Sequence, residues 1–172
     1  MGQTDENMKP ALLVVDIQNV WLDDNAELKK SVEKRIDVIN EAIGWFRRNG
    51  HPIVVVYHED KEMGAVRGTK PFEFPQTVSI EETDMKVVKR YPNAFGKTEL
   101  EAILRREGCD TVAIVGLSAS GCALATYFGA KDYDLKPYLV QNGVASHIEE
   151  HVRFAEDVCD TVSVRDFDKT LR

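Results

Sequence analysis

Short, continuous apolar runs recur along the chain, and polar or turn-forming residues bound each of them. Apolar runs of this length without alternation are typical of strands buried on both faces of a parallel sheet. The clearest example is ALLVVD, which ends in Asp16. The strands predicted in this way cover residues 11–16, 53–57, 85–90, 111–116, 135–141 and 161–166.

Between these runs the apolar residues follow a helical period. Over residues 26–49 they recur every three or four positions and form one stripe, which ends at Asn49-Gly50. Capping boxes, in which a hydroxyl residue precedes a glutamate by three positions, predict helices that begin near Thr98 and Ser146. A further helix, rich in small residues, is expected at about 120–131.

Strands that alternate with helices predict an α/β fold, with a mostly parallel sheet between two helical layers. The 172 residues correspond to one such three-layer domain, expected over 10–172, with residues 1–9 as a disordered tail. Ligands bind such sheets at the carboxyl ends of the strands, near the point where the strand order reverses. We therefore expect function at Asp16, at the long irregular segment 58–86 and at 117–122.

The composition narrows the classes of partner. The chain is 43% hydrophobic and 30% charged, as in soluble globular proteins, and its net charge is −7. An acidic chain lacks the cationic excess that nucleic acids and anionic membranes require, so we expect a small-molecule substrate instead. No apolar run approaches the ~18 residues of a membrane span, and the polar start resembles no signal peptide. Three widely spaced cysteines predict no disulfide framework, which favours a cytoplasmic location.

Cys122 is the sharpest candidate for chemistry. It directly follows a predicted buried strand and begins a helix, where backbone N–H groups favour an anion. A thiol there is expected to have a lowered pKa, and the same N–H groups could stabilise an oxyanion. Free cysteine is also a common small residue of hydrophobic cores, so position alone leaves both interpretations open.

Two charged residues also lie at predicted strand ends. Asp16 could carry protons beside a thiol, or it could be a helix cap or a solvated strand end. Lys89, if partly buried, could keep a neighbouring carboxylate ionised and hold a thiolate, although most lysines are simply solvated. Cys109 and Cys159 are interpreted as structural.

Three segments in this order form a recognisable pattern: VVDIQNVW, VVKRYPNAFGKTELEAIL and VAIVGLSASGCALATYFGA. Together they resemble the isochorismatase-like cysteine hydrolase superfamily, which includes nicotinamidases and N-carbamoyl amidases, over about residues 11–165. The resemblance implies the strand order 3-2-1-4-5-6. It also implies a cofactor-free hydrolase that cleaves a small amide, carbamoyl or related C–N bond through a thioester. Members are usually dimers or larger, so a homo-oligomer, a dimer or tetramer, is expected.

The resemblance also implies roles for individual residues. Cys122 would be the nucleophile, Asp16 would transfer protons, and Lys89 would hold the charges in place. The Leu117–Ser118 peptide would be cis, and the backbone N–H groups of Ser118 and Cys122 would form the oxyanion hole. The residues implied to line the substrate pocket are Gln18, Trp21 and Phe95.

The segment 58–86 is expected to decide the substrate, and Arg67 within it could bind a substrate carboxylate or be solvated. Zinc nicotinamidases carry a D-x-H motif after the second strand. The stretch YHEDKE lacks this motif, so we expect neither a metal nor nicotinamide as the substrate.

Two alternatives remain open. The main one is a non-catalytic ligand-binding or scaffold protein on the same fold, because Ala119, Ser120 and Gly121 depart from the pattern of the family. A lesser one is a zinc-dependent hydrolase, because HIEEH at 147–151 matches an inverted zincin string that would place His147 and His151 on one helical face.

Overall fold

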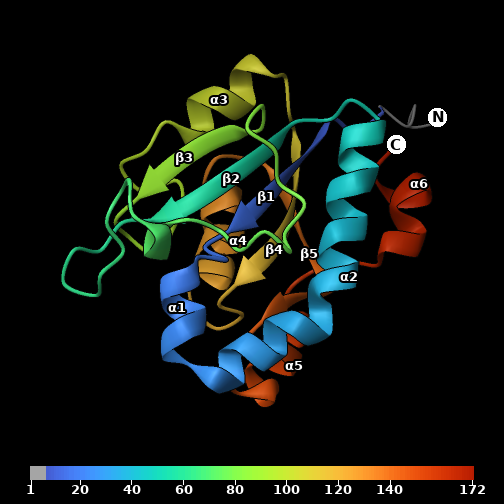
Figure 1. The fold of residues 1–172 in the computed structure, drawn as a ribbon. Helices are drawn as coiled ribbons and strands as arrows, with labels where there is room; N and C mark the ends of the chain where they lie inside the picture. The colour runs from blue at the N-terminus through green and yellow to red at the C-terminus, as the bar shows by residue number, and fades with distance from the viewer. Residues whose placement is uncertain (1–6) are drawn as a thin grey trace, which may run out of the picture.

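The computed structural model describes residues 7–172, so positions 1–6 of the expected tail lie outside the described residues. Six parallel strands form one sheet in the order β3-β2-β1-β4-β5-β6, with helices on both faces (Figure 1). This confirms the predicted fold class and strand order. The strands are β1 (Pro10–Val15), β2 (Ile53–His58), β3 (Met85–Lys89), β4 (Thr111–Leu117), β5 (Lys136–Ala145) and β6 (Thr161–Val162).

The central strands are apolar on both sides because both sides are covered. Every residue of β1 is buried, and its side chains alternate between the two layers. Leu12 and Val14 belong to one core cluster, whereas Leu13 and Val15 belong to the other. Continuous apolar runs, rather than alternating ones, are therefore the pattern this sheet requires.

Each layer of helices covers one face of the sheet. Buried side chains of α1 (Asn19–Asp24), α2 (Ala26–Arg48) and α6 (Phe167–Thr170) pack in the first cluster. Those of α3 (Leu100–Arg106), α4 (Cys122–Asp132) and α5 (Glu149–Val158) pack in the second. No helix within residues 7–172 is long and apolar enough to cross a membrane.

The ends of several elements differ from those predicted. Each capping hydroxyl accepts a hydrogen bond from the backbone N–H two residues later: Thr98 from Leu100, and Ser146 from Ile148. As a result, α3 and α5 begin later than expected. The last strand is only two residues long, because the Ser163 hydroxyl donates to Asp166 and the chain turns into a 3₁₀ turn (Val164–Asp166) and α6. A second 3₁₀ turn, Lys70–Phe72, lies in the long segment.

The strand order reverses between β1 and β4, and the two strands approach closely there. Gly116 has φ +118°, and a Cβ atom at this position would lie 2.1 Å from the Val15 carbonyl oxygen. Only glycine fits such a backbone at such a distance. The carboxyl ends of β1 and β4 are thereby held side by side, where a ligand site is expected.

Candidate active site

Asp16 is placed by the end of β1. Its φ of +57° turns the chain out of the sheet, while its N–H still donates to the Val56 carbonyl at 2.9 Å. Aspartate is among the few residues that tolerate this left-handed conformation. The carboxylate is buried at the carboxyl edge of the sheet.

Lys89 joins the site from the end of β3. Its Nζ lies 2.8 Å from Asp16 Oδ2, 2.7 Å from His58 Nδ1 and 3.2 Å from Cys122 Sγ. The lysine side chain is fully buried, and an ammonium group has three N–H bonds to donate. All three are therefore directed at partners, and Lys89 connects β1, β2 and α4 at a single atom.

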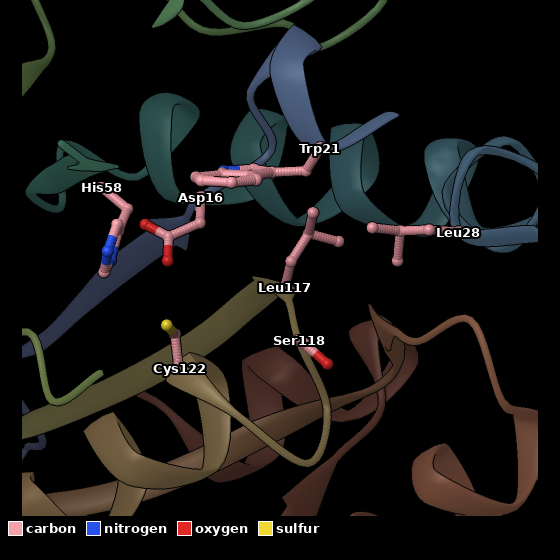
Figure 2. Close-up of a pocket in the computed structure, with 7 residues that line it drawn as sticks. All are labelled: Asp16, Trp21, Leu28, His58, Leu117, Ser118 and Cys122. Atoms are coloured by element: carbon pink, nitrogen blue, oxygen red, sulfur yellow. The ribbon is translucent and has the colours of Figure 1, made fainter. Parts of the chain in front are cut away.

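Cys122 is the first residue of α4 and faces the same point. It lines a cavity of about 280 Å³ together with Asp16, Trp21, Leu28, His58, Leu117 and Ser118. Figure 2 shows the sulfur and the carboxylate pointing toward one another at one end of this cavity, and Leu28 at the other end. Two residues of the implied triad, Asp16 and Cys122, thus line one cavity, and the fully buried Lys89 contacts both of them.

The structure reverses the expected pKa of the thiol. Burial, with the Asp16 charge, raises the pKa of Cys122 to about 12, although Lys89 acts in the opposite direction. Burial also raises the pKa of Asp16 above its usual value, against the attraction of Lys89. The helix N-terminus that predicted a lowered value is present, but desolvation outweighs it. The buried site balances one positive charge with one negative charge, so the resting sulfur is a neutral thiol beside a carboxylate.

Two backbone N–H groups beside the sulfur remain available. The N–H groups of Gly121 and Ala123 donate to the Ser118 carbonyl, whereas those of Ser118 and Cys122 have no acceptor within residues 7–172. The peptide bond between Leu117 and Ser118 is cis, as the resemblance implied. These two N–H groups are the donors that the sequence assigned to an oxyanion hole.

The expected pocket residues divide into two groups. Trp21 lines the cavity, and Gln18 lies behind it, where its carbonyl oxygen accepts from the Trp21 indole at 3.3 Å. Phe95 is buried in the second core cluster and stacks on Tyr133, so it supports the fold and does not line the cavity.

Arg67 lies outside the cavity and is exposed, as in the solvated alternative. Its guanidinium pairs with Glu59 at 2.9 Å on the protein surface, and Arg90 binds the same carboxylate at 2.7 Å. Arg67 does not line the cavity, because Glu59 holds it outside. The aromatic residues of the same segment, Phe72 and Phe74, pack on Tyr57 in the core.

His58 and Leu28 line the cavity but were not selected from the sequence. His58 is the last residue of β2 and pairs in register with Lys89. Its position at a strand end could have identified it, because ligands bind such sheets at the carboxyl ends of the strands. Leu28 comes from the start of α2, and its stripe of apolar residues indicated only core packing.

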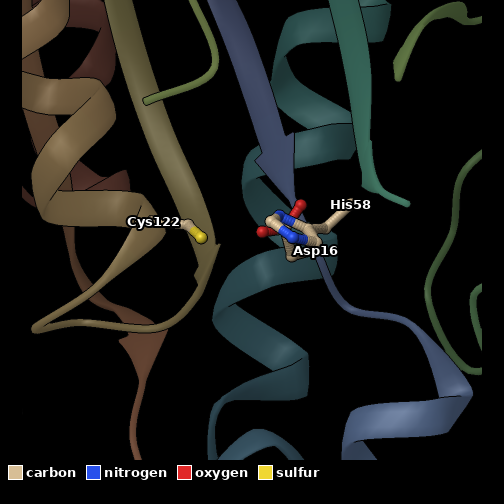
Figure 3. A group of neighbouring side chains, drawn as sticks. All are labelled: Asp16, His58 and Cys122. Atoms are coloured by element: carbon tan, nitrogen blue, oxygen red, sulfur yellow. The ribbon is translucent and has the colours of Figure 1, made fainter. Parts of the chain in front are cut away.

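Within the described part of the chain, one cluster has three metal-ligating side chains: Asp16, His58 and Cys122, whose donor atoms lie within 4.8 Å of one another (Figure 3). Lys89 Nζ contacts a donor atom of each of these side chains, so its ammonium group already occupies the position that a metal ion would need. His147 precedes α5 and His151 lies within it, with Nδ1 3.0 Å from Ser120 Oγ. Because His147 lies outside the helix, the two histidines do not share a helical face as the zincin string predicted, although their ring centroids lie 5.8 Å apart.

Comparisons with known proteins agree with this geometry. The model of the isochorismatase domain matches residues 10–160. The chain is 28% identical over 159 residues to YddQ of Bacillus subtilis, an uncharacterized isochorismatase family protein, covering 88% of this chain and 87% of YddQ. It is 26% identical over 144 residues to a "probable inactive nicotinamidase" of Arabidopsis thaliana, covering 72% and 74% of the two chains.

A solved structure gives the same result. The N-carbamoylsarcosine amidase of Thermoplasma acidophilum superimposes with a TM-score of 0.76 at 27% identity, covering 91% of this chain and 95% of the amidase. The similarity therefore extends over almost the whole fold.

Proposed function

Because the chain belongs to the isochorismatase family of hydrolases, we propose that it cleaves a small amide or carbamoyl C–N bond through a thioester on Cys122. The observation that carries this proposal is that Asp16 and Cys122 line one cavity while buried Lys89 contacts both, at 2.8 Å and 3.2 Å respectively.

The charge balance suggests how the thiol is activated. Lys89 holds Oδ2 of Asp16, while Oδ1 is buried and has no hydrogen-bond partner within residues 7–172. As Sγ bonds to the carbonyl carbon, the thiol proton passes to this free oxygen, so the net charge of the site does not change. The developing oxyanion is stabilised by the N–H groups of Ser118 and Cys122.

The second half of the reaction uses the same proton. Asp16 gives it to the nitrogen as the C–N bond breaks, which leaves a thioester and a free amine or ammonia. A water molecule then attacks the thioester and passes a proton through Asp16 to the departing sulfur. Lys89 keeps its charge throughout, so it compensates whichever of Asp16 and Cys122 is negative.

The cavity favours a compact and largely apolar substrate. Trp21, Leu28 and Leu117 supply the apolar wall, and Gln18 occupies the Trp21 indole N–H. Two cationic groups are already paired, Lys89 with Asp16 inside the site and Arg67 with Glu59 outside it. We therefore favour neutral amides over substrates that need a cationic partner for a carboxylate.

Rapid acid quench followed by peptide mass spectrometry tests the proposal. With a panel of small neutral primary amides and carbamoyl compounds, we expect ammonia release and an acyl mass on the Cys122 peptide alone. Cys109 and Cys159 are internal controls, because neither of them lines the cavity. Undiminished turnover by a Cys122→Ala variant would falsify the assignment of the nucleophile.

One observation favours a second function, that of a ligand-binding protein without catalysis. A thiol whose pKa is raised to about 12 is a weak nucleophile at neutral pH unless Asp16 takes its proton. If this function is the true one, Cys122→Ala keeps any cellular activity and no acyl adduct forms with any amide of the panel.

We also propose that the chain forms a homo-oligomer. Three large apolar side chains on the outer helices, Phe128 of α4 and Phe154 and Val158 of α5, are each about half exposed. Light scattering after size exclusion tests this, and a monomer at micromolar concentration would contradict it.

A further inference from the structure

The imidazole of His58 has two nitrogen atoms in different surroundings. Nδ1 lies 2.7 Å from the Lys89 ammonium, whereas Nε2 has no hydrogen-bond partner within residues 7–172. Nε2 is not among the buried atoms that lack a partner, so this side of the ring is open, and His58 lines the cavity.

The contact with Lys89 decides where the ring carries its proton. An ammonium can only donate, so Nδ1 must accept through its lone pair. Burial and the Lys89 charge both lower the pKa of His58, so the ring is neutral at pH 7. A neutral imidazole whose Nδ1 accepts carries its single proton on Nε2.

The backbone of His58 is also held by hydrogen bonds, which it makes with the Gln18 side chain. The His58 N–H donates to Gln18 Oε1 at 2.8 Å, and the His58 carbonyl accepts from Gln18 Nε2 at 3.0 Å. The fully buried Gln18 amide therefore continues the pairing of β1 with β2 after Asp16 has left the sheet. Trp21 packs edge-on against the ring, with centroids 6.0 Å apart.

From this geometry we propose that His58 is a specificity-determining residue, whose Nε2–H donates to a second acceptor atom on the substrate beyond the scissile amide. The inference rests on the proposed function for the location of the scissile group. The preferred substrate class is thus a compact neutral amide that also carries a carbonyl or similar acceptor. Ser118 also brings a side-chain donor, its hydroxyl group, to the cavity, and Figure 2 shows its oxygen directed away from Cys122.

The tautomer is tested first, by long-range ¹H–¹⁵N spectra of the imidazole rings at neutral pH. The His58 signals are assigned by their loss in His58→Asn, and the three other histidines serve as references. We expect Nε2 to be protonated and Nδ1 to be bare. A proton on Nδ1 would overturn the inference, whether or not Cys122 is a nucleophile.

Binding is tested in a Cys122→Ala background, so that no turnover is needed. The probes are two matched pairs, 3-oxobutanamide with butanamide and 4-oxopentanamide with pentanamide, and binding is followed by the Trp21 indole N–H signal. The oxo compound of at least one pair should bind about fivefold more tightly, as expected for one neutral hydrogen bond.

Two second-site variants identify the donor. His58→Asn keeps an oxygen that can accept from Lys89 but removes the Nε2–H, so the preference should fall to about one. Ser118→Ala should leave the preference intact. The inference is wrong if neither pair shows a preference, if the preference survives His58→Asn, or if Ser118→Ala removes it. Failure of the thioester would leave these binding results unchanged, so the two proposals fail separately.

Discussion

The pair of Asp16 and Lys89 makes the sharpest stability prediction. Their side chains are 5% and 0% exposed, and the charged atoms lie 2.8 Å apart. At this separation Coulomb's law with an effective dielectric constant of about 20 gives about 6 kcal/mol of gross attraction. Removing one partner of a buried pair typically costs about 3–5 kcal/mol, because the remaining charge is left unpaired. We therefore expect Lys89→Met to lower the free energy of unfolding by this amount at pH 8.

The cost should depend on pH, because the stranded carboxylate can bind a proton instead. The cost of the buried unpaired carboxylate cannot exceed the free energy of protonating it, which is about 1.4 kcal/mol for each pH unit above the unfolded pKa of about 3.9. At pH 5 this upper limit is about 1.5 kcal/mol. Burial without Lys89 raises the folded pKa of Asp16 further, so the folded state binds the extra proton. The contribution of Asp16 to the stability of the variant is therefore fully present below about pH 3.9 and is lost as the pH rises toward that raised pKa.

The assay is urea unfolding of four proteins at pH 5 and pH 8 and at one protein concentration: wild type, Lys89→Met, Asp16→Asn and the double variant. Asparagine is chosen because it tolerates the left-handed backbone at position 16. The double variant has no unpaired charge, so it should regain at least about 2 kcal/mol over the sum of the single losses. A loss below about 1 kcal/mol for Lys89→Met at pH 8, or additive losses in the cycle, would refute the reasoning.

Three further predictions concern the site and its frame. Alkylation of resting Cys122 by iodoacetamide should show an apparent pKa higher than that of a free thiol, about 8.5, because burial and the Asp16 charge raise the thiol pKa. A lower apparent pKa in peptide mapping would contradict this prediction. Gly116→Ala should cost more than about 3 kcal/mol in urea unfolding, since its Cβ collides with backbone, whereas Gly50→Ala, also at positive φ but in open space, should cost only about 1–2. Trp21→Leu should lower kcat/KM about tenfold through lost cavity contact, while Arg67→Ala, outside the cavity, should change it less than twofold; the reverse order would place the substrate elsewhere.

The sheet could be predicted because its strands are buried on both faces. ALLVVD and TVAIVG leave no amphipathic alternative, and their order with the intervening helices restricts the topology to a few choices. Short elements were less predictable. The six-residue α1 is too short to show a period, and β6 ends where Ser163 bonds to Asp166, which only the folded chain brings about.

The site shows the same division between local and tertiary information. Asp16 and Lys89 lie at strand ends and Cys122 at a helix start, which are features visible in the sequence, so their meeting at one edge of the sheet could be predicted. The predicted direction of the thiol pKa shift was wrong. A helix start is visible in the sequence, but the desolvation that outweighs its effect depends on neighbours from other strands. The choice between the two alternatives for Arg67 could not be made from the sequence for a similar reason, since the position of its guanidinium depends on Glu59, which also binds Arg90.

The charge pair also constrains how this protein can change over evolutionary time. Cys122 is neutral at rest, so a single substitution can remove it without leaving a buried charge unpaired. Replacing Asp16 or Lys89 first would leave such a charge and put folding itself at risk. When selection for catalysis is lost in a lineage with this arrangement, the nucleophile should therefore disappear before the pair. Descendants that only bind ligands should still carry the aspartate and the lysine at the ends of β1 and β3.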